Sequence, residues 1–351
     1  MSVGLCNVCG ASGDHRVHTT EERVFYSGRL FQYVECSYCG SLSLVSGPED
    51  LSAYYPDTYY AFDREAYSPH SSRATFLHWV ALQAALASPR TAKVSVATAR
   101  HLRLAVQPWI QLLGDLDLHR GMRILDVGSG AGHRLLSMRA MGFEKLTGID
   151  AHLPATAAMR PNPSIDLRRA SVSEVEEGFD LVMFHHSLEH MADPAAELAA
   201  AVRILSDGGA IIIRLPLTQT YAWRTYSSDW VQLDTPRHTV LPTRAGMTHL
   251  ARRCNLDIVR TVFDSTAFQF WGSELNRRRI PVQQSGPDSG PPKDLFTASQ
   301  VAKLQRRAER LNARCDGDQA AFLLRRQPLP TDSESTPAAV RDSAQLPSHR
   351  P

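Results

Sequence analysis

The chain has 351 residues, of which 43% are hydrophobic and 21% are charged, as is usual for a folded globular protein. This composition excludes a mainly disordered, collagen-like or coiled-coil protein. Four Lys and 34 Arg against 36 acidic residues leave a net charge of +2, which argues against a nucleic-acid or membrane-surface partner. The first residues are too polar for a secretory signal, and no apolar run reaches the roughly 18 residues of a membrane span. We therefore expect a soluble, cytoplasmic protein.

Two Cys-x-x-Cys pairs mark the N-terminal region. The pairs are 26 residues apart, and glycine follows the second cysteine of each. Two such turns can present four thiolates as a tetrahedral zinc site, so we predict a structural zinc ribbon over residues 1–50. A redox pair, or replacement of one thiolate by His15 or His18, are the alternatives. The predicted ligands are Cys6, Cys9, Cys36 and Cys39.

Three further regions follow the ribbon. Residues 51–118 begin with a tyrosine-rich segment and continue as an Ala- and Leu-rich stretch, which predicts a helical connector that can serve as a lid. Residues 119–326 alternate apolar strands with helical stretches. Residues 327–351 are rich in Pro, Ser and polar residues, and we expect a disordered tail.

The rhythm of residues 119–326 predicts an α/β domain. Alternating strands and helices indicate a parallel sheet covered on both faces, and two late stretches can add strands at its end. A Pro- and Gly-rich loop, Pro281 to Pro292, interrupts the region. The predicted strands are 123–127, 146–150, 166–169, 179–184, 210–215, 256–263 and 320–325.

A glycine-rich loop follows the first strand of this domain, with the sequence Asp126-Val127-Gly128-Ser129-Gly130-Ala131-Gly132. Glycines let the backbone approach a ligand closely, and the helix that follows attracts an anionic group. Asp150 ends the second strand, 22 residues after Gly128, where a carboxylate can accept ribose hydroxyls. His133 stands where the dinucleotide fingerprint requires Gly or Ala, which argues against a nicotinamide cofactor.

Four motifs in order resemble the class I S-adenosylmethionine-dependent methyltransferases. Besides the glycine loop and Gly148-Ile149-Asp150, they are the 179–194 segment with its Leu188-Glu189-His190 and the turn Leu205 to Gly209. The resemblance implies a Rossmann-like sheet of seven strands, the last antiparallel, and S-adenosylmethionine as cofactor. It implies the cofactor-binding residues Asp126, Gly128, Ser129, Gly130, Gly132, Asp150, Ser171, Val172 and His185.

The ribbon, the tyrosine-rich connector and the methyltransferase domain together resemble a bacterial group tied to sugar and polysaccharide modification. The segment Trp230 to His238 is similar to the pattern of members that accompany surface-glycan genes. Carbon methyltransferases of the group have Glu-His where this chain has Arg237-His238, which argues against carbon methylation. Tyr59 and Trp230 are predicted substrate contacts or packing residues. Arg237 can hold a substrate phosphate or carboxylate, or pair with Asp234.

A hydroxyl acceptor loses its proton during methyl transfer and needs a base with a pKa near neutral, for which histidine is the natural residue. His186 and His190 follow the fourth strand, and His238 follows the fifth. Ligands of open α/β sheets bind beyond the carboxyl ends of the strands, so all three are candidates. His238 is the preferred base. Each can instead pack the structure or line the cofactor.

The sequence thus predicts O-methylation of a sugar, nucleotide-sugar or glycan intermediate, with S-adenosylmethionine as donor and a structural Zn²⁺. The alternatives are a quinone or secondary-metabolite hydroxyl, and a cofactor-binding scaffold without catalysis. A nucleic-acid base is disfavoured, because Phe184-His185-His186-Ser187 stands where amino-group methyltransferases carry Asn/Asp-Pro-Pro-Tyr.

Overall fold

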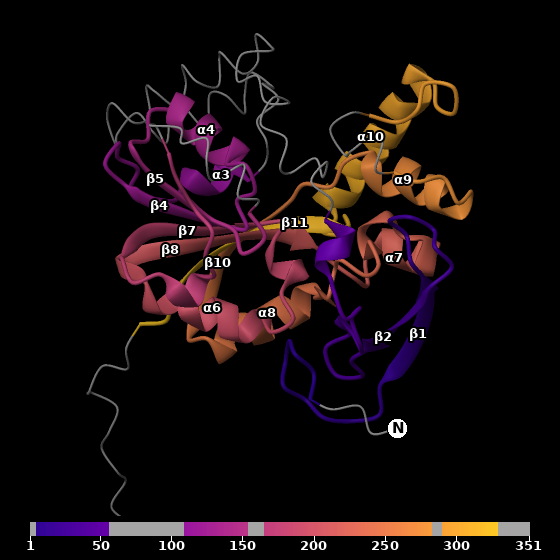
Figure 1. Ribbon diagram of the computed structural model, residues 1–351. Helices are drawn as coiled ribbons and strands as arrows, with labels where there is room; N and C mark the ends of the chain where they lie inside the picture. The colour runs from indigo at the N-terminus through magenta and orange to yellow at the C-terminus, as the bar shows by residue number, and fades with distance from the viewer. Residues whose placement is uncertain (1–4, 56–108, 154–164, 283–289, 329–351) are drawn as a thin grey trace, which may run out of the picture.

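The computed structural model describes residues 5–55, 109–153, 165–282 and 290–328 (Figure 1). Tyr59, most of the predicted helical connector, the middle of the 281–292 loop and nearly all of the predicted tail lie outside the described residues. A seven-stranded sheet forms the centre, in the order β10-β11-β8-β7-β4-β5-β6. Its strands are β4 (Arg123–Val127), β5 (Lys145–Ile149), β6 (Asp166–Arg168), β7 (Phe179–His185), β8 (Leu205–Pro216), β10 (Leu256–Phe263) and β11 (Gln319–Arg326).

The topology confirms the predicted fold class. Neighbouring strands from β6 across to β8 pair in parallel, whereas β11 is antiparallel to both β8 and β10. Every one of the seven predicted strands is present, because long apolar runs bounded by turns are buried on both faces of such a sheet. The carboxyl ends of β4, β5, β7 and β8 therefore share one edge, where the predicted ligand site lies.

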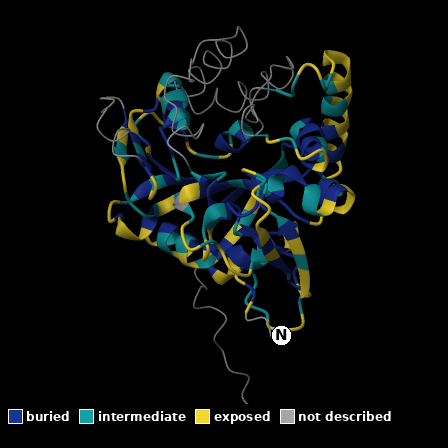
Figure 2. Cartoon of the chain, turned by 45° about the vertical axis from the view of Figure 1, so that its right-hand side comes forward, coloured by how far each residue is buried: buried dark blue, intermediate teal, exposed yellow. Residues whose placement is uncertain are grey.

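Helices cover both faces of the sheet. The short α3 (Ile110–Leu113) and α4 (His133–Ala140) lie on one face, and α6 (Pro194–Arg203) and α8 (Arg244–Arg253) lie on the other (Figure 1). Met138 of α4 and Leu198 of α6 are fully buried in the two resulting core clusters. The central strands β4, β7 and β11 are largely buried, whereas the edge strands β6 and β10 are partly exposed (Figure 2).

Beyond β8 the chain forms a helical region beside the ribbon. It contains α7 (Tyr221–Tyr226), α9 (Phe268–Arg277) and α10 (Ala298–Ala313), which group on one side of the sheet (Figure 1). Trp230 is fully buried between these helices, and its indole N–H donates to Asp318. The short 3-10 turns are η1 (Ser52–Tyr54), η3 (Val172–Glu174), η4 (Leu188–His190), η5 (Ser227–Asp229) and η6 (Val231–Leu233).

The N-terminal region forms two antiparallel hairpins, and its small sheet is completed by a strand of the main domain. The antiparallel strands β1 (Arg16–Glu21), β2 (Leu30–Glu35) and β3 (Leu42–Leu44) are followed in the sheet by β9 (Val240–Leu241). Since β9 lies two residues after His238, the ribbon is hydrogen-bonded to the segment that carries the preferred base. No sequence pattern predicted β9, because a strand of two residues is too short to show a periodic pattern.

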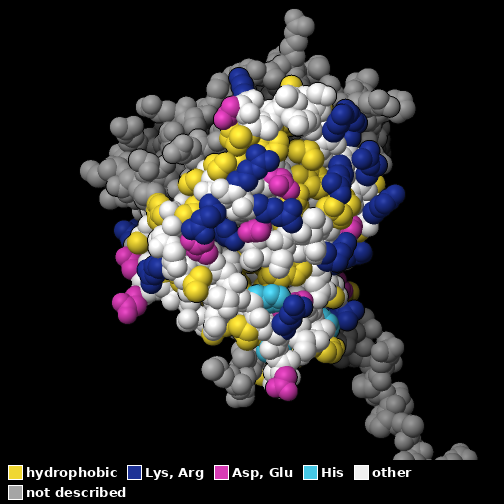
Figure 3. All heavy atoms as spheres, turned by 90° about the vertical axis from the view of Figure 1, so that its right-hand side faces the viewer, with side chains coloured by type: hydrophobic (Ala, Val, Ile, Leu, Met, Phe, Trp, Pro, Cys, Tyr) yellow, Lys and Arg dark blue, Asp and Glu magenta, His cyan; other side chains and the backbone are white. Residues whose placement is uncertain are grey.

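Basic side chains are spread over the face that contains α7, α9, α10 and β1, with acidic and apolar side chains between them (Figure 3). Arg224 pairs with Asp316 at 2.7 Å, and the Arg307 guanidinium lies 4.6 Å from the centre of the Tyr221 ring. The arginines of this face therefore engage local acidic and aromatic partners. None of the helices in the described ranges is both long and apolar enough to cross a bilayer.

Gly246 offers a test of how tightly the ribbon docks on α8. A Cβ atom at this helical position would lie 2.3 Å from Ser41 Oγ and 3.1 Å from Val8 Cγ1, both in the ribbon. Alanine normally favours a helix over glycine by about 1 kcal/mol. We expect Gly246→Ala instead to lower the free energy of unfolding by about 1–3 kcal/mol, because the contact is overpacked. Urea unfolding measures the change, and a stabilised variant would show that the ribbon does not press on α8.

Candidate functional site

The four cysteines of the ribbon come together as the sequence predicts. Cys6 Sγ lies 3.8 Å from Cys39 Sγ, and Cys9 Sγ lies 3.7 Å from Cys36 Sγ. All four sulfur atoms are within 4.8 Å of one another. Tetrahedral zinc with Zn–S bonds of about 2.3 Å requires S···S separations of about 3.8 Å, whereas a disulfide requires about 2.0 Å. The spacing therefore fits Zn²⁺, and all six cysteines are free thiols.

Two matching turns build this cluster. The amide of Gly10 donates to the Cys6 carbonyl and that of Gly40 to the Cys36 carbonyl, each at 2.8 Å. Both glycines have positive φ, +77° and +71°, which other residues rarely adopt, so a glycine is required after each pair. Four thiolates would leave a bound Zn²⁺ no open coordination position, as in structural rather than catalytic zinc sites.

The two histidines considered as alternative ligands are engaged elsewhere. His18 Nε2 lies 2.7 Å from Glu35 Oε2, and the ring packs edge-on against Trp223. His15 Nδ1 accepts a hydrogen bond from the amide of Ser37.

The glycine loop forms a close cradle at the carboxyl end of β4. Gly128, Gly130 and Gly132 all have positive φ, as a sharp turn between strand and helix requires. A Cβ atom at Gly128 would lie 2.4 Å from the Cβ of Ser187, and Ser187 Oγ donates to the Val127 carbonyl at 2.6 Å. The loop is therefore packed directly against Ser187 at the start of η4, between the candidate histidines His186 and His190.

Acidic groups flank the cradle. Asp150 Oδ2 accepts a hydrogen bond from the amide of Gly130, which ties the end of β5 to the loop. Asp126 is buried at the end of β4, and burial raises the pKa of its carboxyl to about 6 against the lowering effect of Arg134. Carboxylates at these positions can accept hydrogen bonds from the hydroxyl groups of a nucleoside-containing cofactor.

The third-strand residues predicted to lie by the adenine divide into two environments. Ser171 caps η3, its amide donating to Glu174 Oε2 at 2.7 Å, and it is only partly buried. Val172 is fully buried in the core beneath the sheet edge. Contact of either residue with a cofactor remains a prediction.

His185 carries the clearest sign that this edge accepts a ligand. Among the residues that the structure describes, neither ring nitrogen has a hydrogen-bond partner, although both are shielded from water. The ring packs edge-on against Trp109 at 5.5 Å, and Arg134 lies over the same indole. A buried imidazole without partners costs free energy, which a polar ligand group can recover. Together with the glycine cradle, this fits the cofactor that the sequence predicts.

The two strongest base candidates lie side by side. The rings of His190 and His238 are 4.7 Å apart and packed edge to face. His238 Nδ1 lies 2.7 Å from the Gln232 carbonyl, and His190 Nδ1 lies 3.1 Å from the Arg237 carbonyl. A carbonyl only accepts, so Nδ1 of His238 carries the proton and its Nε2 is left as a proton acceptor. His190 Nδ1 also lies 2.8 Å from the Tyr55 hydroxyl, which can donate as well as accept, so both tautomers of His190 fit its partners.

His186 occupies a different environment. Its Nδ1 lies 3.1 Å from Glu189 Oε1, and its Nε2 contacts the guanidinium of Arg214, which in turn donates to Asp264 at 2.5 Å. The guanidinium can only donate, so the lone pair of Nε2 is occupied. His186 is therefore a link in a buried network, and it has no free nitrogen with which to act as a base. Its backbone has a positive φ of 54°, a conformation found often at functional sites.

Burial sets the protonation of the cluster. It lowers the pKa of His190 to about 3, the pKa of His238 below its usual range, and the pKa of His186 well below it. Burial also raises the pKa of Glu189 to about 8. For Asp234 the same burial is outweighed by Arg237 and His238, which hold its pKa low. The histidines are thus neutral near pH 7, as a base must be before it accepts a proton.

The predicted substrate residues divide between pairing and packing. Arg237 forms a two-pronged ion pair with Asp234, with distances of 2.9 and 2.7 Å, which is the alternative the sequence left open. Trp230 has no exposed surface, so its position is that of a packing residue. Tyr55, the last described residue of the tyrosine-rich segment, places its hydroxyl 2.8 Å from His190 Nδ1 and stacks on His152.

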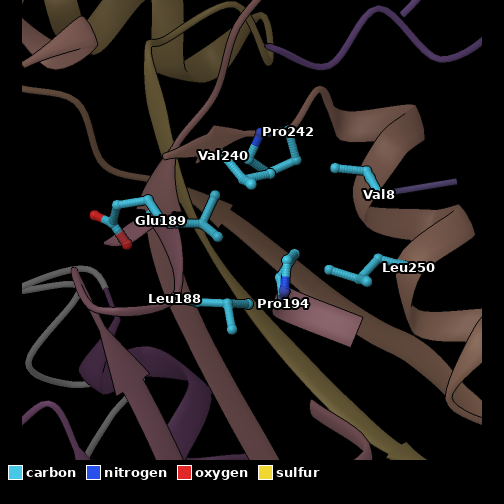
Figure 4. Close-up of a pocket in the computed structure, with 8 residues that line it drawn as sticks. Val8, Leu188, Glu189, Pro194, Val240, Pro242 and Leu250 are labelled. Carbon is cyan, nitrogen blue, oxygen red and sulfur yellow. The ribbon is translucent and has the colours of Figure 1, made fainter. Parts of the chain in front are cut away.

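Glu189 is the site residue that sequence reasoning did not single out. Its side chain is fully buried, and Oε2 has no hydrogen-bond partner. Its carboxylate lies within 4.8 Å of the ring nitrogens of His190 and His238. Glu189 also borders a small apolar cavity between ribbon and sheet, but its carboxylate points away from the other lining residues (Figure 4). The feature of the sequence that could have indicated a role for Glu189 is its position next to His190.

Glu189 should make stability depend on pH. Because its pKa in the folded state is about 8, above the ordinary value of about 4.5, the folded chain holds a proton that the unfolded chain releases. The resulting stabilisation is complete below about pH 4.5 and is lost as the pH rises through about 8. Relative to Glu189→Gln, the wild type should lose up to about 1.4 kcal/mol of unfolding free energy per pH unit across this window.

Urea unfolding of both proteins between about pH 5 and about pH 8 measures this difference. Glu309→Gln on the exposed side of α10 is the matched control and should show no such trend. A difference between wild type and Glu189→Gln that stays constant with pH would contradict the assignment.

Comparison with known proteins identifies a methyltransferase domain in this chain. A family model described as "Methyltransferase domain" matches residues 98–261. The "Ubiquinone biosynthesis O-methyltransferase" of Cereibacter sphaeroides (strain ATCC 17029 / ATH 2.4.9) is 31% identical over 181 residues, which cover 46% of this chain and 71% of that protein. The protein of the same name from Ruegeria sp. (strain TM1040) is 34% identical over 131 residues, covering 34% and 52%. The chain thus spans about half the length of the latter relative.

Solved structures match this chain at low sequence identity. An S-adenosylmethionine-dependent methyltransferase from Mesorhizobium loti has 18% identity and a TM-score of 0.42, with 63% of this chain and 99% of that chain covered. A putative methyltransferase in complex with the Haloferax volcanii Trm112 activator has 16% identity and a TM-score of 0.45, with 70% and 98% covered. From the sequence match to the Cereibacter protein and the sheet topology, the chain belongs to the class I S-adenosylmethionine-dependent methyltransferases.

Proposed function

We propose that this protein transfers a methyl group from S-adenosylmethionine to a hydroxyl oxygen of a small organic acceptor. The observation that carries the proposal is the pair of neutral histidines, His190 and His238, which pack edge to face and of which His238 has its Nε2 left as a proton acceptor. They adjoin the glycine cradle, because η4 packs against Gly128 through Ser187. One edge of the sheet thus combines a cofactor cradle with a base.

The residues of the chain have two tasks in this reaction. When bound, S-adenosylmethionine would supply a methyl group on a positively charged sulfur. The acceptor oxygen would attack the methyl carbon in line with the carbon–sulfur bond, and S-adenosylhomocysteine would leave. The cradle and the buried edge hold the reactants in alignment and away from water. His238 Nε2 accepts the hydroxyl proton as the new oxygen–carbon bond forms, and Asp234, 3.7 Å away, stabilises the resulting imidazolium.

For the acceptor we propose a phenol-type hydroxyl, such as that of a quinone precursor or an aromatic secondary metabolite. Two points support it over a sugar. Matched relatives are named as O-methyltransferases of ubiquinone biosynthesis. Burial lowers the pKa of His238, and so weak a base suits a phenol, whose pKa near 10 makes it more acidic than a sugar hydroxyl.

A sugar or glycan hydroxyl is the second candidate. It is favoured by the segment Trp230 to His238, whose sequence resembles the glycan-associated group. Assays of methyl transfer to catechol-type phenols and to nucleotide sugars, run side by side, separate the two acceptor classes.

His238→Ala tests the catalytic role. We expect turnover to fall by about 10²–10⁴-fold, because removal of a general base has effects of this size. The affinity for S-adenosylhomocysteine should stay unchanged, since the cradle is formed by other residues. His190→Ala is the matched control, and it should lose less activity because His238 is retained. Unchanged turnover in His238→Ala would rule out His238 as the base, and no turnover in the wild type with either acceptor class would favour a scaffold.

A further inference from the structure

The segment that carries His238 is held on one side by the ribbon. The amide of Arg23 donates to the Thr235 carbonyl at 3.0 Å, and the amide of Leu44 donates to the Thr239 carbonyl at 2.8 Å. Residues 240 and 241 then pair with β3. Ribbon backbone thus contacts this segment both before and after His238.

Between these contacts lies one side chain that reaches His238 itself. The hydroxyl of Tyr33 in β2 donates to the carbonyl of His238 at 2.7 Å. Tyr33 has no exposed surface, and burial raises the pKa of its hydroxyl, so it remains protonated and a donor. A buried carbonyl that lost this donor would be left without a partner, at a cost of about 1–3 kcal/mol.

The zinc-binding turn supports the far end of the same segment. Thr243 Oγ1 donates to the Cys39 carbonyl at 2.6 Å, and the Thr243 amide donates to Ser41 Oγ at 3.2 Å. Cys39 is a predicted zinc ligand. The hydrogen bond from Thr243 to Cys39 therefore links the predicted metal site to the backbone of residues 235–243.

The opposite side of the segment faces the sheet edge. The amide of Thr239 donates to the Glu189 carbonyl at 2.7 Å, and His190 Nδ1 lies 3.1 Å from the Arg237 carbonyl. His238 therefore lies between two rigid bodies, the ribbon on one side and η4 on the other. Its imidazole is aimed by the Gln232 carbonyl, but the position of its backbone depends on both bodies.

We propose that the zinc ribbon is a working part of the catalytic site, in which Tyr33 is the positioning residue that fixes the backbone of His238. This inference rests on the proposed role of His238 as the base. It gives the ribbon a function in the reaction besides its own folding. No residue of the ribbon needs to touch the acceptor for this role.

Tyr33→Phe tests the proposal, because it removes only the hydroxyl and keeps the buried ring. We expect amide hydrogen exchange over residues 237–241 to accelerate by about tenfold, since a local opening then breaks one hydrogen bond fewer. Tyr38→Phe is the matched control in the same ribbon, because Tyr38 is 69% exposed and its ring lies against His249. It should leave exchange unchanged.

The second readout is the titration of His238 itself, followed by NMR in histidine-labelled protein and assigned with His238→Ala. In Tyr33→Phe the ring should become more hydrated, and its pKa should rise toward the ordinary value of about 6.5. The charged and titratable groups that face it are Asp234, Arg237, His190, His186 and Glu189, and none is changed by the substitution.

Accelerated exchange with a shifted His238 titration supports the proposal, provided that zinc content and S-adenosylhomocysteine affinity match the wild type. Unchanged exchange and titration in Tyr33→Phe would overturn it. Neither readout needs turnover, so failure here is distinct from failure of the proposed reaction, which His238→Ala tests. Where turnover is measurable, a lower kcat with an unchanged KM for S-adenosylmethionine is expected.

Discussion

The hydrogen bonding between the ribbon and residues 235–243 is the interaction on which the candidate site depends. The pairing of β3 with β9 joins the small sheet of the cysteine ribbon to the loop that follows the fifth strand of the main sheet. A loop of this kind is ordinarily mobile, because it has few apolar contacts of its own. Here it is held from both sides, and one of these contacts joins Tyr33 to His238, which are 205 residues apart in the sequence. A small ribbon of this size has little core, and the four thiolates compensate for that.

The second constraint is the burial of charge at the sheet edge. Three histidines, Glu189, Asp234 and two arginines lie in one water-poor region, and each finds at least one local partner. Removal of these groups from water keeps the histidines neutral and keeps a proton on Glu189. Charged groups in such a region would interact strongly with the positive sulfonium of a bound cofactor, because a medium of low dielectric constant screens charges weakly. Burial of these titratable groups costs stability, but it also shifts their pKa values, as is typical of groups that take up or release protons in a reaction.

The sequence predicted those features that depend on residues close together in the chain. The seven strands follow from apolar runs, the cysteine cluster from two spaced pairs, and the glycine loop from three glycines with positive φ. Features made by contact between distant segments were missed. The pairing of β9, the hydroxyl of Tyr33 beneath His238 and the link from His186 to Arg214 leave no local pattern. Glu189 was overlooked although it stands next to His190, because an acidic residue in a 3-10 turn is ordinary until its burial is known.

The central claim is that this sheet edge binds S-adenosylmethionine. The most direct test is calorimetric titration of S-adenosylmethionine and S-adenosylhomocysteine into the full chain, with zinc content determined on the same sample. We predict micromolar binding of both compounds at one site per chain, with one zinc per chain, and at least about tenfold weaker binding in Asp150→Asn, which lacks the charged ribose acceptor. Absence of binding by folded, zinc-loaded protein would contradict the account.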